Sequence, residues 1–410
     1  MNCRFCQSTL VNEFVDLINS PPSNSYLSAE ELNEPEVYFP LKLFVCDQCF
    51  LVQVDEYKKA DEIFSSKYAY FSSFSSSWLA HCKKYTEEMI VRFGFNSSSL
   101  IIEIASNDGY LLQYFKEKNI PVLGIEPSES TAKVARGKGI ETITEFFGKA
   151  LAEKLIIEKG KADLLLGNNV LAHVPDINDF VKGMKIALND SGVITMEFPH
   201  LLQLVWNNQF DTIYHEHFSY LSFTTVVNIF AQNGLQIFDV QEIATHGGSL
   251  RIFAGHSDRK IFAVSPSVRN LLTKEENAGI KNPNFYKDFQ PRVDQVKIDL
   301  LKFLIEKKSE HKTVAAYGAA AKGNTLLNYC GIREDLIRYV VDASPHKQGK
   351  FLPGSHIPIV KEDHLKRTKP DYVIILPWNI KEEICDQLRY IEEWNGKFVT
   401  AIPSIEVLGN

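Results

Sequence analysis

The chain has 410 residues, which is too long for one ordinary hydrophobic core and predicts two or three domains. Hydrophobic residues make up 45% and charged residues 23% of the sequence, as in ordinary soluble globular proteins. The formal net charge of −7 and the lack of a basic block disfavour a nucleic-acid partner. No apolar run approaches the roughly 20 residues that span a bilayer, and the N-terminus shows no apolar signal region. We therefore expect a cytoplasmic protein, with no membrane partner, that acts on small molecules.

Four of the seven cysteines form two Cys-x-x-Cys pairs, Cys3 with Cys6 and Cys46 with Cys49, and 39 residues lie between the pairs. In a reducing compartment this spacing favours tetrahedral coordination of zinc over disulfides, with a redox pair or unligated thiols as minor alternatives. Four thiolates leave no open position on the metal, so the zinc would be structural.

An aromatic and serine-rich stretch, residues 67–78, precedes a helical pattern that ends near Phe93. It is a linker or a flap over a polar ligand. Alternating strands and helices follow, which predicts a largely parallel, doubly wound sheet with ligands at the carboxyl ends of its strands. The expected strands are residues 99–104, 121–125, 163–169 and 192–198, closed by an antiparallel pair, 234–240 and 248–254.

Residues 257–312 are expected to form helices and connections, and a second α/β unit begins after them. Its predicted elements are a strand at 313–317, a turn at 318–324, a helix at 325–330 and parallel strands at 337–341 and 372–376. The fold class is therefore α/β. The expected domains are a zinc-binding domain (1–66), a Rossmann-like middle domain (67–257) and a C-terminal Rossmann-like domain (258–410).

The turn after the strand 99–104 has the spacing that an adenosine ligand needs. Small residues allow a ligand to approach, and Glu126, at the end of the next strand, can accept hydrogen bonds from ribose hydroxyls. Ala105 and Ser106 stand where glycines are usual and Asp108 is acidic, so the turn suits the sulfonium of S-adenosylmethionine better than the pyrophosphate of NAD. The candidate cofactor residues here are Glu103, Ala105, Ser106, Asn107, Asp108, Gly109, Glu126 and Pro127.

Asn168, Asn169 and His173 follow the strand expected next to this turn, either near the cofactor or as local capping residues. Some 40 residues later, Tyr214-His-Glu-His217 brings titratable groups into an apolar segment. Histidine titrates near neutrality and suits removal of a proton next to a carbonyl. In a regular strand Tyr214 and Glu216 would face away from His217, so joint action requires a kink or loop there.

The turn at residues 317–324 combines small residues with Lys322. Backbone amides at a helix N-terminus and one lysine can hold a phosphate, whereas the small residues alone would allow tight helix packing. Both interpretations remain open on this turn viewed alone.

Five motifs occur in order along the chain: the two Cys-x-x-Cys pairs, Glu-Ile-Ala-Ser-Asn-Asp-Gly, Asn-Asn-Val-Leu-Ala-His-Val, Tyr-His-Glu-His-Phe-Ser-Tyr-Leu-Ser and Tyr-Gly-Ala-Ala-Ala-Lys-Gly-Asn. With these motifs the sequence resembles the sugar 3-C-methyltransferases over essentially the whole chain. These enzymes methylate nucleotide-linked 4-keto-deoxy sugars. The resemblance implies an N-terminal zinc-binding domain, a class I methyltransferase domain that binds S-adenosylmethionine, and a C-terminal domain that helps to bind a dTDP- or GDP-linked sugar. An NAD-dependent nucleotide-sugar oxidoreductase is the alternative, and the oligomeric state is open, with a monomer compatible with the sequence.

The resemblance also implies roles for single residues. His217 would be the base that removes the proton from carbon 3, with Tyr214, Glu216 and His173 beside it. Asn168 and Asn169 would line the cofactor. The residues implied to contact the nucleotide sugar are Tyr68, Tyr70, Glu197, Tyr317, Lys322, Gly323 and Asn324. The substituent on carbon 3, hydroxyl or amine, is not specified.

Overall fold

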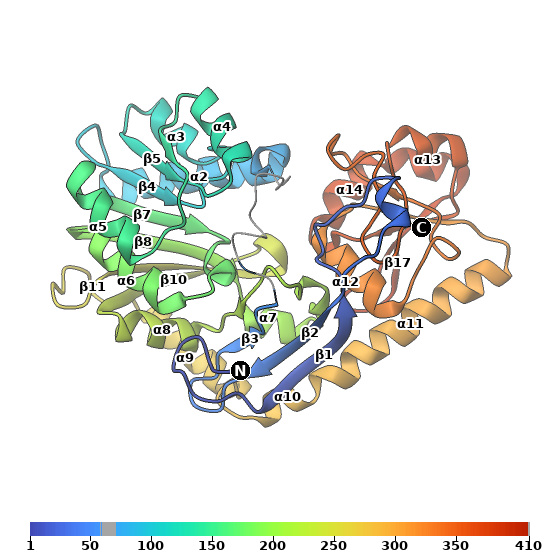
Figure 1. Cartoon of the computed structure of the whole chain (residues 1–410), viewed down its shortest axis with the longest axis horizontal. Coiled ribbons are helices and arrows are strands. Elements are labelled where there is room, and N and C mark those ends of the chain that lie inside the picture. Colours follow the sequence, from blue (N-terminus) through green and yellow to red (C-terminus); the bar gives the residue numbers. More distant parts are fainter. Residues whose placement is uncertain (58, 60–70, 409–410) are drawn as a thin grey trace.

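The computed structural model describes residues 1–57, 59 and 71–408. Within these residues the strands form three sheets, which lie in three regions of the molecule (Figure 1). The N-terminal sheet and the long helix α11 connect the middle region to the C-terminal region. Among the described residues no helix is long and apolar enough to cross a membrane.

The N-terminal sheet has four strands in the order β1-β2-β3-β9. Its strands are β1 (Asn12–Ser20), β2 (Phe39–Val45), β3 (Val52–Val54) and β9 (Ser219–Tyr220). The last strand comes from the middle of the chain and pairs antiparallel with β3. This pairing places the Tyr214–His217 segment next to the zinc-binding region, which the sequence did not predict.

The middle sheet has seven strands in the order β10-β11-β8-β7-β4-β5-β6, and only β11 is antiparallel to its neighbours. This order is the class I methyltransferase arrangement, and it confirms the predicted parallel sheet and its antiparallel closing pair. The strands are β4 (Ile101–Ile104), β5 (Val122–Ile125), β6 (Thr142–Ile143), β7 (Ala162–Asn168), β8 (Leu188–Pro199), β10 (Leu235–Ile243) and β11 (Ser249–His256).

Helices cover both faces of the middle sheet. The first of them, α2, begins at a serine whose side chain accepts a hydrogen bond from the Trp78 amide, and it ends at Gly94 in the left-handed conformation. The helices of this region are α2 (Ser76–Phe93), α3 (Leu112–Glu117), α4 (Glu129–Gly137), α5 (Lys149–Glu158), α6 (Ile177–Ala187), α7 (Leu201–Trp206) and α8 (Phe223–Gln232).

The C-terminal sheet has six strands in the order β14-β13-β12-β15-β16-β17, all parallel except β17. Its strands are β12 (Val314–Tyr317), β13 (Val340–Val341), β14 (Ile359–Val360), β15 (Tyr372–Ile375), β16 (Lys397–Thr400) and β17 (Glu406–Leu408). The helices from residue 266 onward are α9 (Pro266–Ala278), α10 (Asn284–Lys287), α11 (Phe289–Ser309), α12 (Ala321–Cys330), α13 (Asp363–Thr368) and α14 (Lys381–Gln387). The predicted second parallel unit is therefore present, but α12 begins four residues earlier and β13 is shorter than expected.

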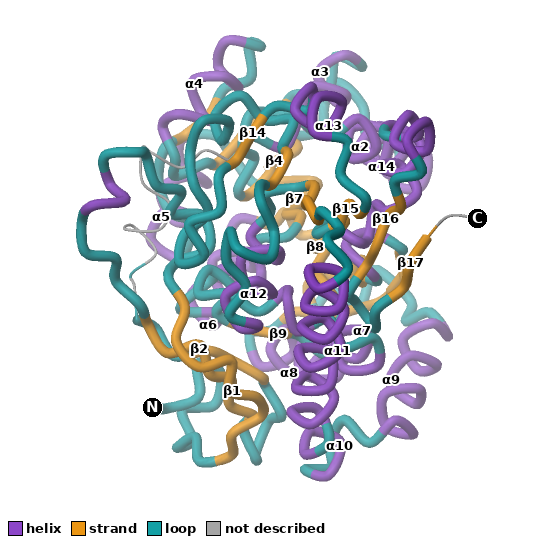
Figure 2. The backbone as a smooth tube through the Cα atoms, turned by 90° about the vertical axis from the view of Figure 1, so that its right-hand side faces the viewer, coloured by secondary structure: helices purple, strands orange, loops and turns teal. Residues whose placement is uncertain are grey.

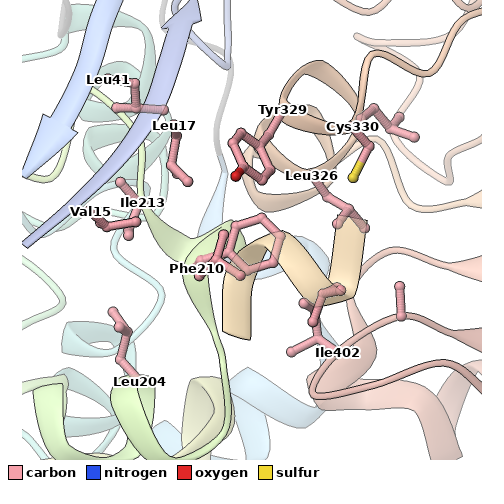
Figure 3. Packing of buried hydrophobic residues seen from close by; sticks show 14 of the residues in the cluster. Val15, Leu17, Leu41, Leu204, Phe210, Ile213, Leu326, Tyr329, Cys330 and Ile402 are labelled. Atoms are coloured by element: carbon pink, nitrogen blue, oxygen red, sulfur yellow. The ribbon is translucent and has the colours of Figure 1, made fainter. Parts of the chain in front are cut away.

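One hydrophobic cluster joins all three regions. Leu17 from β1, Phe210 from the middle region and Leu326 from α12 belong to it and are nearly fully buried. Figure 3 shows these side chains converging from three parts of the chain. Helix α11 extends from α10 at the bottom of the molecule to the C-terminal sheet (Figure 2). Because the cluster is shared, the relative position of the two Rossmann-like units is set by packing.

Candidate active site

The turn after β4 adopts the backbone conformation usually given to glycine. Its φ angles are +57° at Ala105, +48° at Asn107 and +74° at Gly109. A left-handed conformation costs a non-glycine residue roughly 1–2 kcal/mol, and such strain is concentrated at functional sites. Glu126, after β5, accepts a hydrogen bond from the Asn107 amide (2.9 Å), and burial raises the pKa of its carboxyl. Pro127 follows directly and is partly buried.

Several polar atoms at this edge of the sheet are buried and have no hydrogen-bond partner among the described residues. They are Oγ of Ser106, Oδ1 of Asp108, both side-chain polar atoms of Asn168 and Oδ1 of Asn169. Burial raises the pKa of Glu103 well above its ordinary value. Because buried polar groups in folded proteins are nearly always hydrogen-bonded, this group fits a polar ligand such as S-adenosylmethionine.

The segment before α2 lies directly on this turn. The Ser72 amide donates to Oδ1 of Asn107 at 3.0 Å, and the Ser73 hydroxyl donates to the Asp108 carboxylate. This contact agrees with the flap interpretation for the described part of the segment. The two predicted sugar contacts, Tyr68 and Tyr70, lie outside the described residues.

Tyr214 to His217 form a turn, closed by a hydrogen bond from the His217 amide to the Tyr214 carbonyl at 3.0 Å. The regular strand is therefore absent, and the expected kink is present. The ring centroids of Tyr214 and His217 are 4.0 Å apart, and those of His173 and His217 are 4.6 Å apart. Two segments far apart in the sequence thus supply one cluster of titratable rings.

Hydrogen bonds fix the tautomers of both histidines. Nδ1 of His217 lies 3.1 Å from the Thr212 carbonyl, and Nδ1 of His173 lies 2.7 Å from the Glu216 carbonyl. A carbonyl oxygen only accepts, so each Nδ1 carries the proton and each Nε2 has the lone pair. Burial lowers the pKa of His217 well below its ordinary value, and protonation of His173 would lower it further. Burial also lowers the pKa of His173 to about 4. Both imidazoles are therefore neutral at neutral pH and able to accept a proton.

Glu197, at the end of β8, lies in a buried ion pair. Nε of Arg251 on β11 is 2.7 Å from Oε1 of Glu197, and Nε2 of His81 on α2 is 2.9 Å from Oε2. Burial raises the pKa of Glu197, but His81 and Arg251 together lower it by more, so the net change is a lower pKa. The carboxylate thus joins α2 to the sheet, and a contact between Glu197 and the sugar stays a prediction.

A second buried polar group, which the sequence did not indicate, lies beside the turn formed by Tyr214 to His217. Asp211 is fully buried and accepts a hydrogen bond from Nε1 of Trp378 at 2.7 Å. Lys322 lies over the Trp378 ring (4.9 Å) and donates to Oδ1 of Asn379 at 2.6 Å. Burial raises the pKa of Asp211 to about 6, and the Lys322 charge opposes this shift. Trp378 and Asn379 lie shortly after the carboxyl end of β15, and this position could have indicated them.

His246, which the sequence did not indicate, lies beside the predicted cofactor residue Asn169. Nε2 of His246 is 3.0 Å from Nδ2 of Asn169, and the ring of His246 is 5.3 Å from that of Trp78. The φ angle of Asn169 is +56°, and its amide donates to the Glu197 carbonyl at 2.8 Å. His246 lies after the end of β10 and directly before two glycines, at the carboxyl edge of the sheet. This position could have indicated it from the sequence.

The turn after β12 resembles the first turn in construction but differs in charge. The Ala319 amide donates to Oδ2 of Asp342, which follows β13, at 2.8 Å. Nζ of Lys347 is 2.7 Å from the Ala319 carbonyl and 3.5 Å from Oδ2 of Asp342. With Lys322 on the first turn of α12, two cations flank this helix N-terminus, which is a favourable setting for an anionic group.

Three residues predicted to contact the nucleotide sugar have packing contacts. A Cβ at Gly323 would lie 2.8 Å from Cδ1 of Leu376, so only glycine fits there without rearrangement. Nδ2 of Asn324 donates to the Ser23 carbonyl at 2.6 Å, and the Tyr317 side chain is buried in the C-terminal core. Tight helix packing, the alternative weighed for this turn, is therefore present at Gly323. The binding roles of Tyr317, Gly323 and Asn324 stay predictions.

Cys3, Cys6, Cys46 and Cys49 are brought together, and their sulfur atoms all lie within 4.8 Å of one another. Tetrahedral zinc with bonds of about 2.3 Å needs sulfur atoms somewhat less than 4 Å apart, so the cluster fits with small adjustment. Nε2 of Gln53 lies 3.3 Å from Sγ of Cys3 and can donate to a thiolate ligand. The predicted structural zinc site is confirmed.

Three family models match successive parts of the chain. Residues 3–64 match a zinc binding domain, residues 79–240 a methyltransferase domain and residues 244–403 a C-methyltransferase C-terminal domain. The C-methyltransferase NovU from Streptomyces niveus is 34% identical over 406 residues, which cover 99% of this chain and 96% of that protein. Nothing in these matches supports the alternative NAD-dependent oxidoreductase.

Two solved structures each resemble about half of the chain. An S-adenosylmethionine-dependent methyltransferase from Anabaena variabilis is 15% identical, with a TM-score of 0.39, and covers 50% of this chain and 99% of its own. Magnesium protoporphyrin IX methyltransferase from Synechocystis, solved with bound S-adenosylmethionine, is 16% identical, with a TM-score of 0.34, and covers 48% of this chain and 89% of its own. The full-length relative and the family models carry the assignment, and the chain belongs to the S-adenosylmethionine-dependent C-methyltransferase family.

Proposed function

We propose that this enzyme methylates carbon 3 of a nucleotide-linked 4-keto-6-deoxy sugar, of dTDP or GDP type, in the biosynthesis of a branched-chain deoxysugar. The observation that carries the proposal is the position of the neutral His217. Its ring lies in a tilted contact with Tyr214 and an edge-on contact with His173. The segment that holds it contacts both Rossmann-like units: the Glu216 carbonyl accepts from His173, which follows β7, and the Ile213 carbonyl accepts from Thr325 of α12 at 2.7 Å.

The chemistry requires a base next to a ketone. A proton on carbon 3 is acidic because carbon 4 is a carbonyl carbon. Nε2 of His217 takes this proton, and the electron pair of the broken C–H bond moves into an enolate whose oxygen is the former ketone oxygen. A hydroxyl donor such as that of Tyr214 stabilises the charge on the enolate oxygen. S-adenosylmethionine, when bound, would supply an electrophilic methyl group: as carbon 3 bonds to the methyl carbon, the bond from that carbon to sulfur breaks and its electron pair stays on the sulfur of S-adenosylhomocysteine.

The remaining roles follow from the two turns. The turn after β4, with Asp108 and Glu126, would bind S-adenosylmethionine, and the turn after β12, with Lys322, would bind the anionic part of the nucleotide sugar. Tyr68 and Tyr70 would border the sugar. The division into domains at residues 1–66, 67–257 and 258–410 belongs to the same proposal, as does a monomeric enzyme.

Mass spectrometry tests the proposal. The enzyme is incubated with S-adenosylmethionine and a panel of dTDP- and GDP-linked 4-keto-6-deoxy sugars, and the products are analysed for added methyl groups. We expect one methyl group on carbon 3, in a reaction that needs both compounds. Tight binding of NAD without binding of S-adenosylmethionine would contradict the proposal, as would methylation at another atom.

A further inference from the structure

The connection between β1 and β2, residues 21–38, leaves the zinc-binding region and lies on the C-terminal unit. We call it the crossing segment, and Figure 1 shows it reaching from the N-terminal strands to the C-terminal region. Leu27 pairs with Phe351 as an isolated antiparallel bridge. The carboxylate of Glu36 accepts hydrogen bonds from the Gly354 amide at 2.9 and 3.1 Å. The crossing segment is therefore anchored at two points beyond its own sheet.

Between these anchors and β1, the crossing segment contacts the catalytic turn. Nδ2 of Asn24 donates to Oε1 of Glu216 at 2.7 Å. Glu216 is 5% exposed, and its own carbonyl is the acceptor for Nδ1 of His173. One residue of the catalytic turn thus receives a hydrogen bond from the zinc-binding region on its side chain and another from the middle region on its backbone.

The crossing segment also contacts the second turn. The Tyr26 hydroxyl donates to the Ala319 carbonyl at 2.6 Å, and its oxygen lies 3.4 Å from Oδ1 of Asn24. Lys347 donates to the same carbonyl and lies over the Tyr26 ring at 5.4 Å. Polar contacts therefore run without interruption from Lys347 and Ala319 through Tyr26 and Asn24 to Glu216.

The side-chain nitrogen of Asn24 can only donate a hydrogen bond. It therefore binds the Glu216 carboxylate, which accepts, without neutralising the carboxylate charge. A hydrogen bond to an ionised group in a buried site is short and strong, and it restricts the carboxylate to one orientation. The charged or titratable groups around this contact are Glu216 itself, His173, Tyr26, Lys347 and Asp342. Removing the amide would take this one hydrogen bond from the carboxylate without disturbing either sheet.

We propose that Asn24 is a positioning residue for methyl transfer: it orients Glu216, and the crossing segment makes the zinc-binding region a working part of the active site. The inference rests on the proposed function. It goes beyond that function because it assigns a role in the reaction to a region whose metal is structural.

Steady-state kinetics of two variants test this inference. Asn24→Ala should lower kcat about 10- to 100-fold, the usual effect of losing one hydrogen bond to a charged group, and leave the KM for S-adenosylmethionine unchanged. Asn24→Asp should be inactive at high pH and recover as the pH falls, because two adjacent carboxyls share one proton and the protonated acid can again donate. Asn33→Ala, an exposed residue of the same segment, is the matched control and should behave like the wild type.

Two readouts separate positioning from folding. Zinc content and thermal unfolding should match the wild type in Asn24→Asp at low pH, where activity returns. An unchanged kcat in Asn24→Ala, or an Asn24→Asp profile with the shape of the wild-type profile, would overturn the inference. Failure of the wild-type enzyme to methylate any 4-keto sugar would instead overturn the proposed function, so the two failures are distinguishable.

Discussion

Two units of this chain share one construction and differ in charge. In each, a buried strand leads into a turn and a helix, and a carboxylate after the neighbouring parallel strand accepts an amide of that turn: Glu126 from Asn107, and Asp342 from Ala319. The first turn carries the buried Asp108, whereas the second is flanked by two lysines. The same backbone frame therefore suits a sulfonium-bearing adenosine ligand in one place and an anionic nucleotide in the other.

The two turns also differ in what supports them. Ser72 and Ser73, from the segment before α2, cover the first turn, whereas the crossing segment of the zinc-binding region contacts the second. The turn at Tyr214 to His217 contacts both units. Variants that alter the support, the charge or the backbone conformation of one turn should therefore have different effects on the two sites.

Loss of the zinc should have the largest effect. Small zinc domains gain about 10–16 kcal/mol of apparent metal-binding free energy, and here that free energy maintains the support of the second turn. We expect Cys46→Ser to lose zinc, to lower the thermal unfolding temperature strongly and to abolish nucleotide-sugar binding. Metal analysis and thermal unfolding measure this, with Cys385→Ser on α14 as the control that keeps its zinc. An unchanged unfolding temperature in metal-free protein would contradict the prediction.

His217→Asn should lower turnover by about 10²- to 10⁴-fold, the range expected for the loss of a general base, without weakening the binding of either ligand. The matched control is His215→Asn. His215 lies on the other side of the turn, with Nε2 3.1 Å from the Pro40 carbonyl and its ring packed against Phe39. We expect this control to keep turnover within a few-fold of the wild type. Equal losses in the two variants would show that the turn is needed only for folding.

Charge removal at the two turns should give opposite patterns of binding. Lys322→Met should weaken the binding of the nucleotide sugar by about 10- to 100-fold and leave the binding of S-adenosylmethionine unchanged. Asp108→Asn should weaken the binding of S-adenosylmethionine by a similar factor and leave that of the nucleotide sugar unchanged. Isothermal titration of each variant with each ligand measures the four dissociation constants. If both variants weaken both ligands to the same extent, the two turns do not divide the ligands between them.

The smallest effects should come from backbone conformation, with opposite signs at the two turns. Gly318 has a φ of +91°, and a Cβ there would lie 2.4 Å from Cδ of Pro377, so Gly318→Ala should lower the free energy of unfolding by about 1–3 kcal/mol. Ala105→Gly relieves a left-handed alanine, partly offset by glycine's entropy, and should raise that free energy by less than about 1 kcal/mol. Denaturant unfolding measures both, and changes of the same sign would contradict the comparison.

The sequence predicted features that depend on local pattern. The strands and turns of both units, the antiparallel pair and the four zinc ligands all follow from periodicity and spacing over short stretches. The kink at Tyr214–His217 was predicted from the requirement that both rings act together, and the turn that the structure shows there brings them to 4.0 Å.

Features that depend on distant contacts could not be predicted in this way. The pairing of β9 with β3 joins segments far apart in the sequence. The hydrogen bonds from Trp378 to Asp211 and from Asn24 to Glu216 join residues that are 167 and 192 positions apart. Glu197 shows the same limit, since its ion pair with Arg251 depends on the pairing of β8 with β11. Gly323 has a packing reason to be glycine in its contact with Leu376, and its predicted role in a phosphate site stays a prediction.

Hydrogen exchange at carbon 3 of the sugar tests the proposed mechanism most directly. With S-adenosylhomocysteine in place of S-adenosylmethionine, no methyl group can be transferred, and in deuterated water a base that forms the enolate exchanges the carbon 3 proton for deuterium. We predict that the wild-type enzyme incorporates deuterium at carbon 3 of its nucleotide-linked 4-keto sugar, and that His217→Asn binds the same sugar without exchange. Equal exchange rates in the two proteins would contradict the assignment of His217 as the base.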